Sequence, residues 1–250
     1  MNIVFLSSLP RAGNTLLGSI INENNKIKLS PNSITLDILY ELDRLKQKDI
    51  FKNFPKESSL NNLIKQSLFE YYKDWNCNLI LDRGPWGTPK NLEILSKIFS
   101  KPKFVILVRP LIECVSSFAK LQIDNKNYTK NNINKYLLEL LDFESGIIGK
   151  NIWSINNIIK TKQNYKIFYY EELVNNTDLF LYNLSCYLNF TLKKPNKINQ
   201  FKIGDISYCD DIKNLHKIRT DSICKSNYVM EDYLNYDMIE YIKNNNPLNL

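Results

Sequence analysis

Short apolar runs alternate with longer amphipathic segments along the chain. Mostly apolar runs without polar alternation occur at 3–6, 79–81, 104–108 and 166–169, which is typical of parallel strands buried on both faces. Apolar residues at helical spacing predict helices at 16–21, 36–45, 60–75, 91–100, 112–121, 133–148, 153–160, 179–188 and 231–243.

Strands that alternate with helices predict an α/β fold in which helices flank a central parallel sheet. We expect one domain over residues 1–250, with a frayed tail at about 244–250. Ligands of such sheets bind at the carboxyl ends of the strands. The chemistry is therefore expected near 8–15, 82–86, 109–117 and 170–173.

Composition agrees with a globular protein that prefers anions. Hydrophobic residues make up 44% of the 250 residues and charged residues 24%, which are ordinary values for a folded domain. The net charge of +7 favours anionic ligands, although lysine and asparagine are abundant throughout. No lysine-rich block suggests a nucleic-acid-binding arm, so we expect no nucleic-acid partner.

The cysteine and histidine content argues against a zinc site. Five cysteines are widely spaced without a Cys-x-x-Cys pair, and His216 is the single histidine. Free thiols fit a reducing compartment. The apolar run before Ser7 is too short for a signal peptide, and no run approaches the roughly 20 apolar residues of a membrane span. We therefore expect a cytoplasmic protein with no membrane partner.

The turn between the first strand and the first helix has the pattern of an anion-binding loop. Backbone N–H groups converge on an anion where a helix starts in this way. In the pattern Gly-x-x-x-x-Gly-Lys-Ser/Thr, Gly13 and Thr15 fit, but Ser8 replaces the first glycine. Asn14 replaces the lysine that a nucleoside triphosphatase uses, and Arg11 supplies a cation three residues earlier. The alternative is an ordinary turn with a surface arginine.

A second candidate site follows the third predicted strand. Arg109 leaves the end of that strand, where a lone charge is costly without a counter-anion. Pro110 suits the start of the next helix, and Ser117 lies two turns into it. A guanidinium and a hydroxyl in these places could share one phosphate. The alternative pairs Arg109 with Glu113.

Together these two sites resemble the cofactor site of sulfotransferases that use 3′-phosphoadenosine 5′-phosphosulfate (PAPS). The family's first loop reads roughly Pro-Arg/Lys-Ser/Ala-Gly-Ser/Thr-Thr-Leu, and here it is Pro10-Arg11-Ala12-Gly13-Asn14-Thr15-Leu16. Its second motif, an arginine at a strand end with a serine eight residues later, is matched by Arg109 and Ser117.

Three weaker matches extend the resemblance to about residue 225, and it looks closest to bacterial and phage-type members. They are the second-strand element Asp82-Arg83-Gly84-Pro85-Trp86, the element Tyr169-Tyr170-Glu171-Glu172-Leu173 and the late basic loop Leu215-His216-Lys217-Ile218-Arg219. Trp86 is expected to pack, or to lie near the adenine.

The resemblance implies a three-layer, P-loop-like fold and a metal-free enzyme that releases adenosine 3′,5′-bisphosphate (PAP). It implies that the amides of Gly13, Asn14 and Thr15 hold the 5′-phosphate, with the Thr15 hydroxyl as a further donor. It places Arg11 and Arg83 against the transferring sulfonyl group, and Arg109 and Ser117 on the 3′-phosphate. The other cofactor-binding residues that it implies are Ala12, Leu16, Tyr170, Lys217 and Arg219.

The resemblance does not supply the general base. Family members use a histidine after the second strand, where this chain has Asp82 and Arg83, or a glutamate about 21 residues after the loop arginine, where it has Asn32. Asp82 ranks first, although it could instead orient Arg83 through an ion pair. The remaining candidates are Asp37 and Glu41, which could equally form a solvated helix face, and His216, which could equally belong to the cofactor loop.

The sequence thus predicts sulfonate transfer from PAPS to a hydroxyl of a small-molecule, carbohydrate or peptide acceptor. Segments 30–75 and 125–160 are expected to build the acceptor pocket. Two alternatives stay open. The first is an ATP-dependent small-molecule kinase, against which the missing loop lysine argues. The second is a non-catalytic nucleotide-binding member of the family, which the missing base favours.

Overall fold

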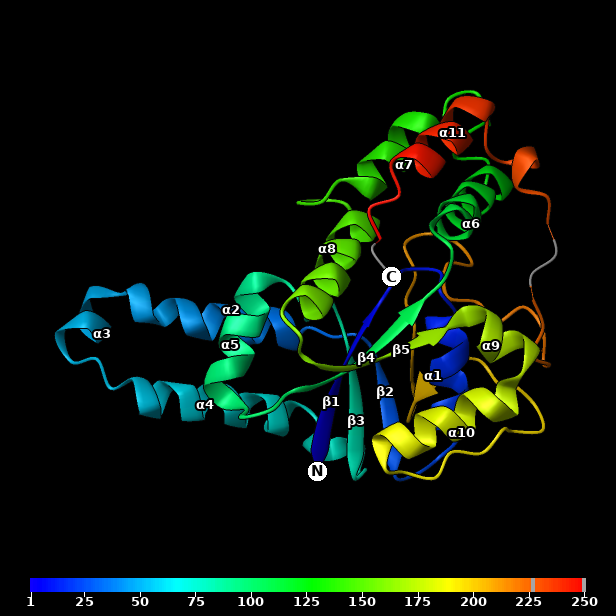
Figure 1. Ribbon diagram of the computed structural model, residues 1–250. Helices are drawn as coiled ribbons and strands as arrows, with labels where there is room; N and C mark the ends of the chain where they lie inside the picture. Colours follow the sequence, from blue (N-terminus) through cyan, green and yellow to red (C-terminus); the bar gives the residue numbers. More distant parts are fainter. Residues whose placement is uncertain (226–227, 249–250) are drawn as a thin grey trace.

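The structure, a computed structural model, describes residues 1–225 and 228–248. Within these residues, five parallel strands form the main sheet in the order β2-β3-β1-β4-β5 (Figure 1). Their bounds are β1 Asn2–Ser8, β2 Ile27–Asn32, β3 Leu79–Arg83, β4 Lys103–Val108 and β5 Asn164–Tyr169. The predicted α/β fold with a central parallel sheet between layers of helices is confirmed.

Helices cover the two faces of this sheet, and α2, α3 and α4 project from it as an arm (Figure 1). The α-helices of the described part are α1 Asn14–Asn22, α2 Thr35–Arg44, α3 Asp49–Asn53, α4 Glu57–Tyr71, α5 Pro89–Ile98, α6 Leu111–Asp124, α7 Asn134–Leu141, α8 Ile147–Lys160, α9 Tyr170–Asn175, α10 Thr177–Leu188 and α11 Tyr236–Asn244. None of the helices in the described ranges has the length and apolar character needed to cross a bilayer.

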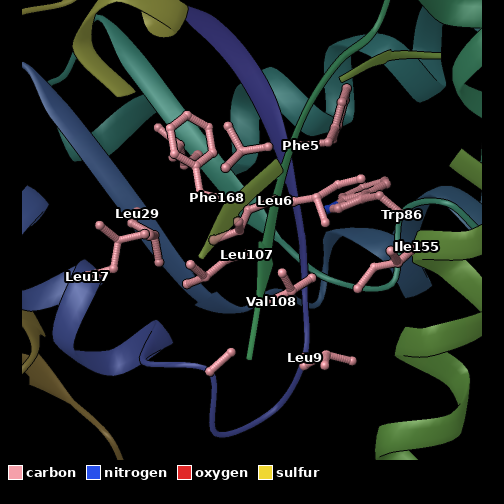
Figure 2. Packing of buried hydrophobic residues seen from close by; sticks show 14 of the residues in the cluster. Phe5, Leu6, Leu9, Leu17, Leu29, Trp86, Leu107, Val108, Ile155 and Phe168 are labelled. Atoms are coloured by element: carbon pink, nitrogen blue, oxygen red, sulfur yellow. The ribbon is translucent and has the colours of Figure 1, made fainter. Parts of the chain in front are cut away.

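The core forms where β1, β3 and β4 lie side by side. Their inward residues are fully buried, as the unbroken apolar runs predict. Phe5 belongs to this cluster (Figure 2), with its ring centroid 4.6 Å from that of Trp86 and 5.7 Å from that of Phe104. Trp86 is therefore a packing residue, one of the two roles expected for it.

The edge strand β2 was not predicted, because its sequence lacks an apolar run. Pro31 cannot donate to a ladder, and proline is tolerated where a strand lies at a sheet edge. The pairing with β3 shifts register between Leu29 and Asn32. Ser30 compensates at this point, since its Oγ accepts a hydrogen bond from the Arg83 amide at 2.9 Å.

The predicted break between two helices at 149–152 is wrong. One helix, α8, runs through these residues, and the break falls earlier, at 142–146. Asp142 causes it, because its Oδ1 accepts hydrogen bonds from the amides of Glu144 and Ser145 at 3.0 and 2.8 Å. Such a local side-chain turn competes with helix formation.

The polar C-terminal segment folds back toward the loop after β1. It begins with a short antiparallel hairpin, β6 Lys202–Ile203 and β7 Ile206–Ser207, which the sequence pattern did not predict. The 3-10 turn Met230–Asp232 precedes α11. In the expected tail, Asn156 Nδ2 donates to the Pro247 carbonyl at 2.7 Å, while 249–250 lie outside the described residues.

Phe5→Ala should lower the free energy of unfolding by about 3–5 kcal/mol, because it opens a cavity in a core that cannot collapse around it. Phe54→Ala is the matched control, since Phe54 is 76% exposed and its removal should change stability by less than about 0.5 kcal/mol. Urea unfolding followed by circular dichroism measures both. Equal losses in the two variants would contradict the placement of Phe5.

Candidate functional site

A cavity of about 450 Å³ opens at the carboxyl ends of the strands. Its walls come from the loop after β1, the ends of β3 and β4, helix α6 and the segment 215–225. No Asp or Glu is among the described residues that line it. Seven cationic side chains do line it, within the same described set: Arg11, Arg83, Arg109, Lys120, Lys217, Arg219 and Lys225.

The loop between β1 and α1 presents an open helix N-terminus to this cavity. Gly13 is the N-cap of α1, with φ 85° in the left-handed region, and no side chain caps the helix or places an acid in its first turn. A Cβ on Gly13 would lie 2.8 Å from the Tyr170 ring. Backbone N–H groups at such a start bind anions. Thr15 and Leu16 also line the cavity.

Asn14 stands at the position of the nucleoside triphosphatase lysine, but it faces the base of the loop. It is buried, and its Nδ2 donates to the Leu9 carbonyl at 2.8 Å. Ala12 is also fully buried, and its amide donates to the same carbonyl at 3.2 Å. These two residues therefore shape the turn, and the side chain of Ala12 does not reach the cavity.

Arg11 connects the loop to two other parts of the site. Its backbone is left-handed, with φ 64°, a conformation that costs about 1–3 kcal/mol for a residue other than glycine. Its Nε donates to Ser117 Oγ at 3.1 Å, and its Nη1 donates to the Leu215 carbonyl. Burial and, to a smaller extent, the charges of Arg219 and Arg109 lower the pKa of Arg11 to about 10.

Arg109 is 5% exposed and is hydrogen-bonded to the loop between β1 and α1. Its Nε pairs with Glu113 Oε2 at 2.8 Å, so the structural ion pair considered from the sequence does form. Its Nη1 donates to the Arg11 carbonyl at 2.9 Å. The guanidinium also lies over the Tyr170 ring, 4.2 Å from its centroid. Arg109, Ser117 and Tyr170 all line the cavity, as the resemblance implies for them.

Arg83 comes from the end of β3 and is 7% exposed. Burial lowers the pKa of Arg83, and the Tyr208 hydroxyl acts in the opposite direction. Successive side chains of a strand point to opposite faces of the sheet. Arg83 lines the cavity, and Asp82, one residue earlier, is not among its lining residues.

Asp82 is fully buried in a network of hydroxyl groups on the other side of β3. Its carboxylate accepts hydrogen bonds from Thr35 Oγ1 at 2.8 Å and from Ser30 Oγ at 3.2 Å. Burial raises the pKa of Asp82 to about 7, against the lowering effect of these hydroxyls. Among the described residues Asp82 forms no ion pair with Arg83, so the network joins β3 to β2 and α2 instead.

The four candidate bases lie in different places, and of these four described residues His216 alone lines the cavity. Asp37 is exposed on α2. Glu41 pairs with Arg44 at 2.9 Å on the solvent side of the same helix. His216 belongs to the segment that closes over the loop, and its Nδ1 lies 2.5 Å from Asp210 Oδ1.

Several lining residues have no strong signal in the sequence. Lys120 could have been found, because it lies three residues after Ser117 on α6 and thus on the same helix face. Lys225 and Tyr228 come from a stretch without periodicity, so pattern reasoning could not place them. The predicted residues Lys217 and Arg219 do line the cavity. The described residues contain no cluster of three or more His, Cys, Asp or Glu side chains arranged to hold a metal ion.

Solved structures with this fold are sulfotransferase domains. The sulfotransferase domain from the Synechococcus PCC 7002 olefin synthase superposes with a TM-score of 0.55 at 18% identity, covering 98% of this chain and 94% of that one. The sulfotransferase domain from the curacin biosynthetic pathway superposes with a TM-score of 0.51 at 20% identity, covering 76% and 74%. No protein-family profile matches the chain, and no curated protein matches its sequence. The likeness confirms the predicted resemblance at the level of the fold.

Gly13→Ala should destabilise the protein more than Gly204→Ala. Both glycines have positive φ, which costs an alanine about 1–2 kcal/mol. A Cβ at Gly204 meets nothing within 4 Å, whereas one at Gly13 meets Tyr170, which adds about 1–3 kcal/mol of overpacking. Urea unfolding of the two variants gives the difference. Equal costs would show that the Tyr170 ring does not constrain the loop.

Proposed function

We propose that this protein is a sulfotransferase that moves a sulfonate from PAPS to a hydroxyl group of an acceptor. The observation that carries the proposal is the cavity beside the N-terminus of α1, where seven cationic side chains and no acidic one line the described walls. A ligand with several negative charges is needed to balance them. The sulfotransferase fold of the chain points in the same direction.

The residues present fit a donor with phosphate groups at two separate positions. The amides of Gly13, Asn14 and Thr15 would hold the 5′-phosphate at the start of α1. Arg109 and Ser117, which line the same cavity and contact Arg11, would hold the 3′-phosphate. The second pair distinguishes PAPS from an adenylate without a 3′-phosphate, and the resemblance of these motifs supports it.

Arg11 and Arg83 are the two cations placed to act on the transferring group. Negative charge grows on the bridging oxygen as the bond to sulfur breaks, and fixed cations stabilise that charge without reorganising. Both side chains are largely buried and held by other groups, Arg11 by Ser117 and Arg83 beside Tyr208. This pre-ordering is what in-line displacement at sulfur requires of the chain.

A kinase is the less favoured function for this site. The β- and γ-phosphates of a triphosphate need the loop lysine and a metal. Asn14 occupies the lysine position, and its side-chain amide donates a hydrogen bond to the Leu9 carbonyl. An arginine three residues before the lysine position suits a donor with one phosphate and one sulfonate.

The acceptor would enter from the side where the two expected segments meet the cavity. Asn32 from the end of β2 and Ile147 from the start of α8 line it there. One is polar and the other apolar, which fits a sugar, a tyrosine of a peptide or a small metabolite. We place this activity in the cytoplasm, with neither nucleic acid nor membrane as a partner.

Arg109→Ala should weaken PAP binding about 100-fold, since it removes the buried cation proposed to pair with the 3′-phosphate. Isothermal titration with PAP and with adenosine 5′-monophosphate separates contact from loop damage. A contact to the 3′-phosphate predicts a large loss for PAP and a small loss for the monophosphate. Arg44→Ala, an exposed arginine outside the cavity, should leave both affinities unchanged. No PAP binding by the wild type would contradict the proposal.

Arg11→Ala should reduce the rate of sulfonate transfer by about 10²–10³, the loss found when one donor to a developing oxyanion is removed. Arg11→Lys keeps the charge and should recover part of the rate. Transfer from labelled PAPS to a mixture of phenols, sugars and tyrosine peptides measures both. Hydrolysis of PAPS without transfer by the wild type would favour the non-catalytic alternative.

A further inference from the structure

We infer that His216 is the general base of this site and that Asp210 positions it. The inference rests on the proposed function, because it assigns the group that takes the proton from the acceptor hydroxyl. The base then belongs to the segment that covers the cavity, and not to the end of β3, where Asp82 was the first candidate.

Asp210 contacts His216 through both carboxylate oxygens. Its Oδ1 lies 2.5 Å from His216 Nδ1, and its Oδ2 accepts a hydrogen bond from the His216 amide at 2.8 Å. A carboxylate on Nδ1 keeps the proton on that nitrogen. The lone pair of the ring is then on Nε2, the nitrogen that a general base needs free.

The imidazole is also held flat against an aromatic ring. Its centroid lies 3.8 Å from that of Tyr208, and the two rings are 6° from parallel. Tyr208 packs in turn on Phe201, with centroids 4.9 Å apart. The stacking on Tyr208 therefore fixes the plane of the imidazole, and the contact with Asp210 fixes the direction of Nδ1 within that plane. A base must be oriented in this way to act on a bound hydroxyl.

The surroundings of His216 favour its neutral form. Burial lowers the pKa of His216, Asp210 raises it, and Arg83 and Arg11 lower it. The ring of Tyr208 faces the imidazole as well. The two arginines are the ones assigned to the transferring sulfonyl group, and both line the cavity that His216 also lines.

The other uncharged titratable groups of the described cavity wall are engaged elsewhere. Tyr170 lies beneath Arg109. The Tyr228 hydroxyl contacts Ser116 Oγ at 3.0 Å and the Glu113 carbonyl at 3.2 Å. Cys224 Sγ lies 3.4 Å from Thr220 Oγ1. Among the described residues, His216 is thus the lining group with a fixed orientation and an available lone pair.

The proposed step transfers one proton, forms one bond to sulfur and breaks another. His216 Nε2 takes the proton of the acceptor hydroxyl as that oxygen bonds to sulfur. The bond between sulfur and the bridging oxygen breaks, and the bridging oxygen keeps the electron pair beside Arg11 and Arg83. The products are the sulfate ester, PAP and a protonated His216, which returns its proton to solvent.

Because His216 is the single histidine of the chain, nitrogen-15 NMR of histidine-labelled protein tests this arrangement directly. The wild type should show the proton on Nδ1 and a bare Nε2. Asp210→Asn should lower the pKa of His216 and mix the two tautomers, since it removes the charge that raises that pKa. Asp211→Asn is the matched control, an exposed neighbouring carboxylate, and should change neither. A wild-type proton on Nε2 would overturn the inference.

Kinetics and binding separate a base from a ligand contact. His216→Gln should lower kcat by about 10²–10⁴-fold while the Kd for PAP changes less than the rate. In the wild type, kcat should fall as the pH drops through the pKa that NMR reports, and this fall should vanish in His216→Gln. The loss should shrink for 4-nitrophenol at a pH where this acceptor is already ionised.

Two further outcomes distinguish the role of His216 from the proposed sulfotransferase function. Unchanged transfer by His216→Gln, or a loss confined to PAP affinity, would overturn the assignment of His216 and leave the sulfotransferase proposal intact. A wild type that binds no PAP would contradict the proposed function, and the role of His216 with it.

Discussion

The buried guanidinium of Arg109 fixes the geometry on which the rest of the site depends. A charge at the end of β4 is costly unless it is paired, and Glu113, four residues later on α6, provides the partner. Its Nη1 then donates to the Arg11 carbonyl, and the flat face of the guanidinium rests on Tyr170. That ring occupies the space beside Gly13. One side chain thus sets the relative positions of the β1–α1 loop, α6 and α9.

Once the loop is fixed, the cationic side chains of the cavity are held near one another in spite of their repulsion. Burial and the neighbouring charges of Arg219 and Arg109 lower the pKa of Arg11, which means that the protein holds this positive charge at a cost. A bound polyanion relieves that repulsion. The folding energy of the sheet and its helices therefore supports a site organised in advance for negative charge, which is the arrangement that speeds reactions with growing negative charge.

The sequence predicted the buried strands and the binding loop because both depend on local features. Unbroken apolar runs marked β1, β3 and β4, and the spacing of Gly13, Arg109 and Ser117 marked the cavity floor. β2 escaped prediction because it lacks an unbroken apolar run; its ladder with β3 is regular up to Leu29, and the Ser30 hydroxyl replaces it beside Pro31. The resemblance located Lys217 and Arg219 in the cavity roof, but it gave no sign of the contact between Asp210 and His216, which depends on how a segment without periodicity folds back.

Asp82 ranked first as the base, but the alternation of side chains along a strand argues against this choice. Neighbouring residues of a strand point to opposite faces, so a cavity that contains Arg83 excludes the side chain before it. The acid–base group must then come from outside the sheet. His216 comes from the closing segment, which Arg11 holds through the Leu215 carbonyl. On the proposed mechanism, the cation that faces the reacting group therefore also anchors the segment that carries the base.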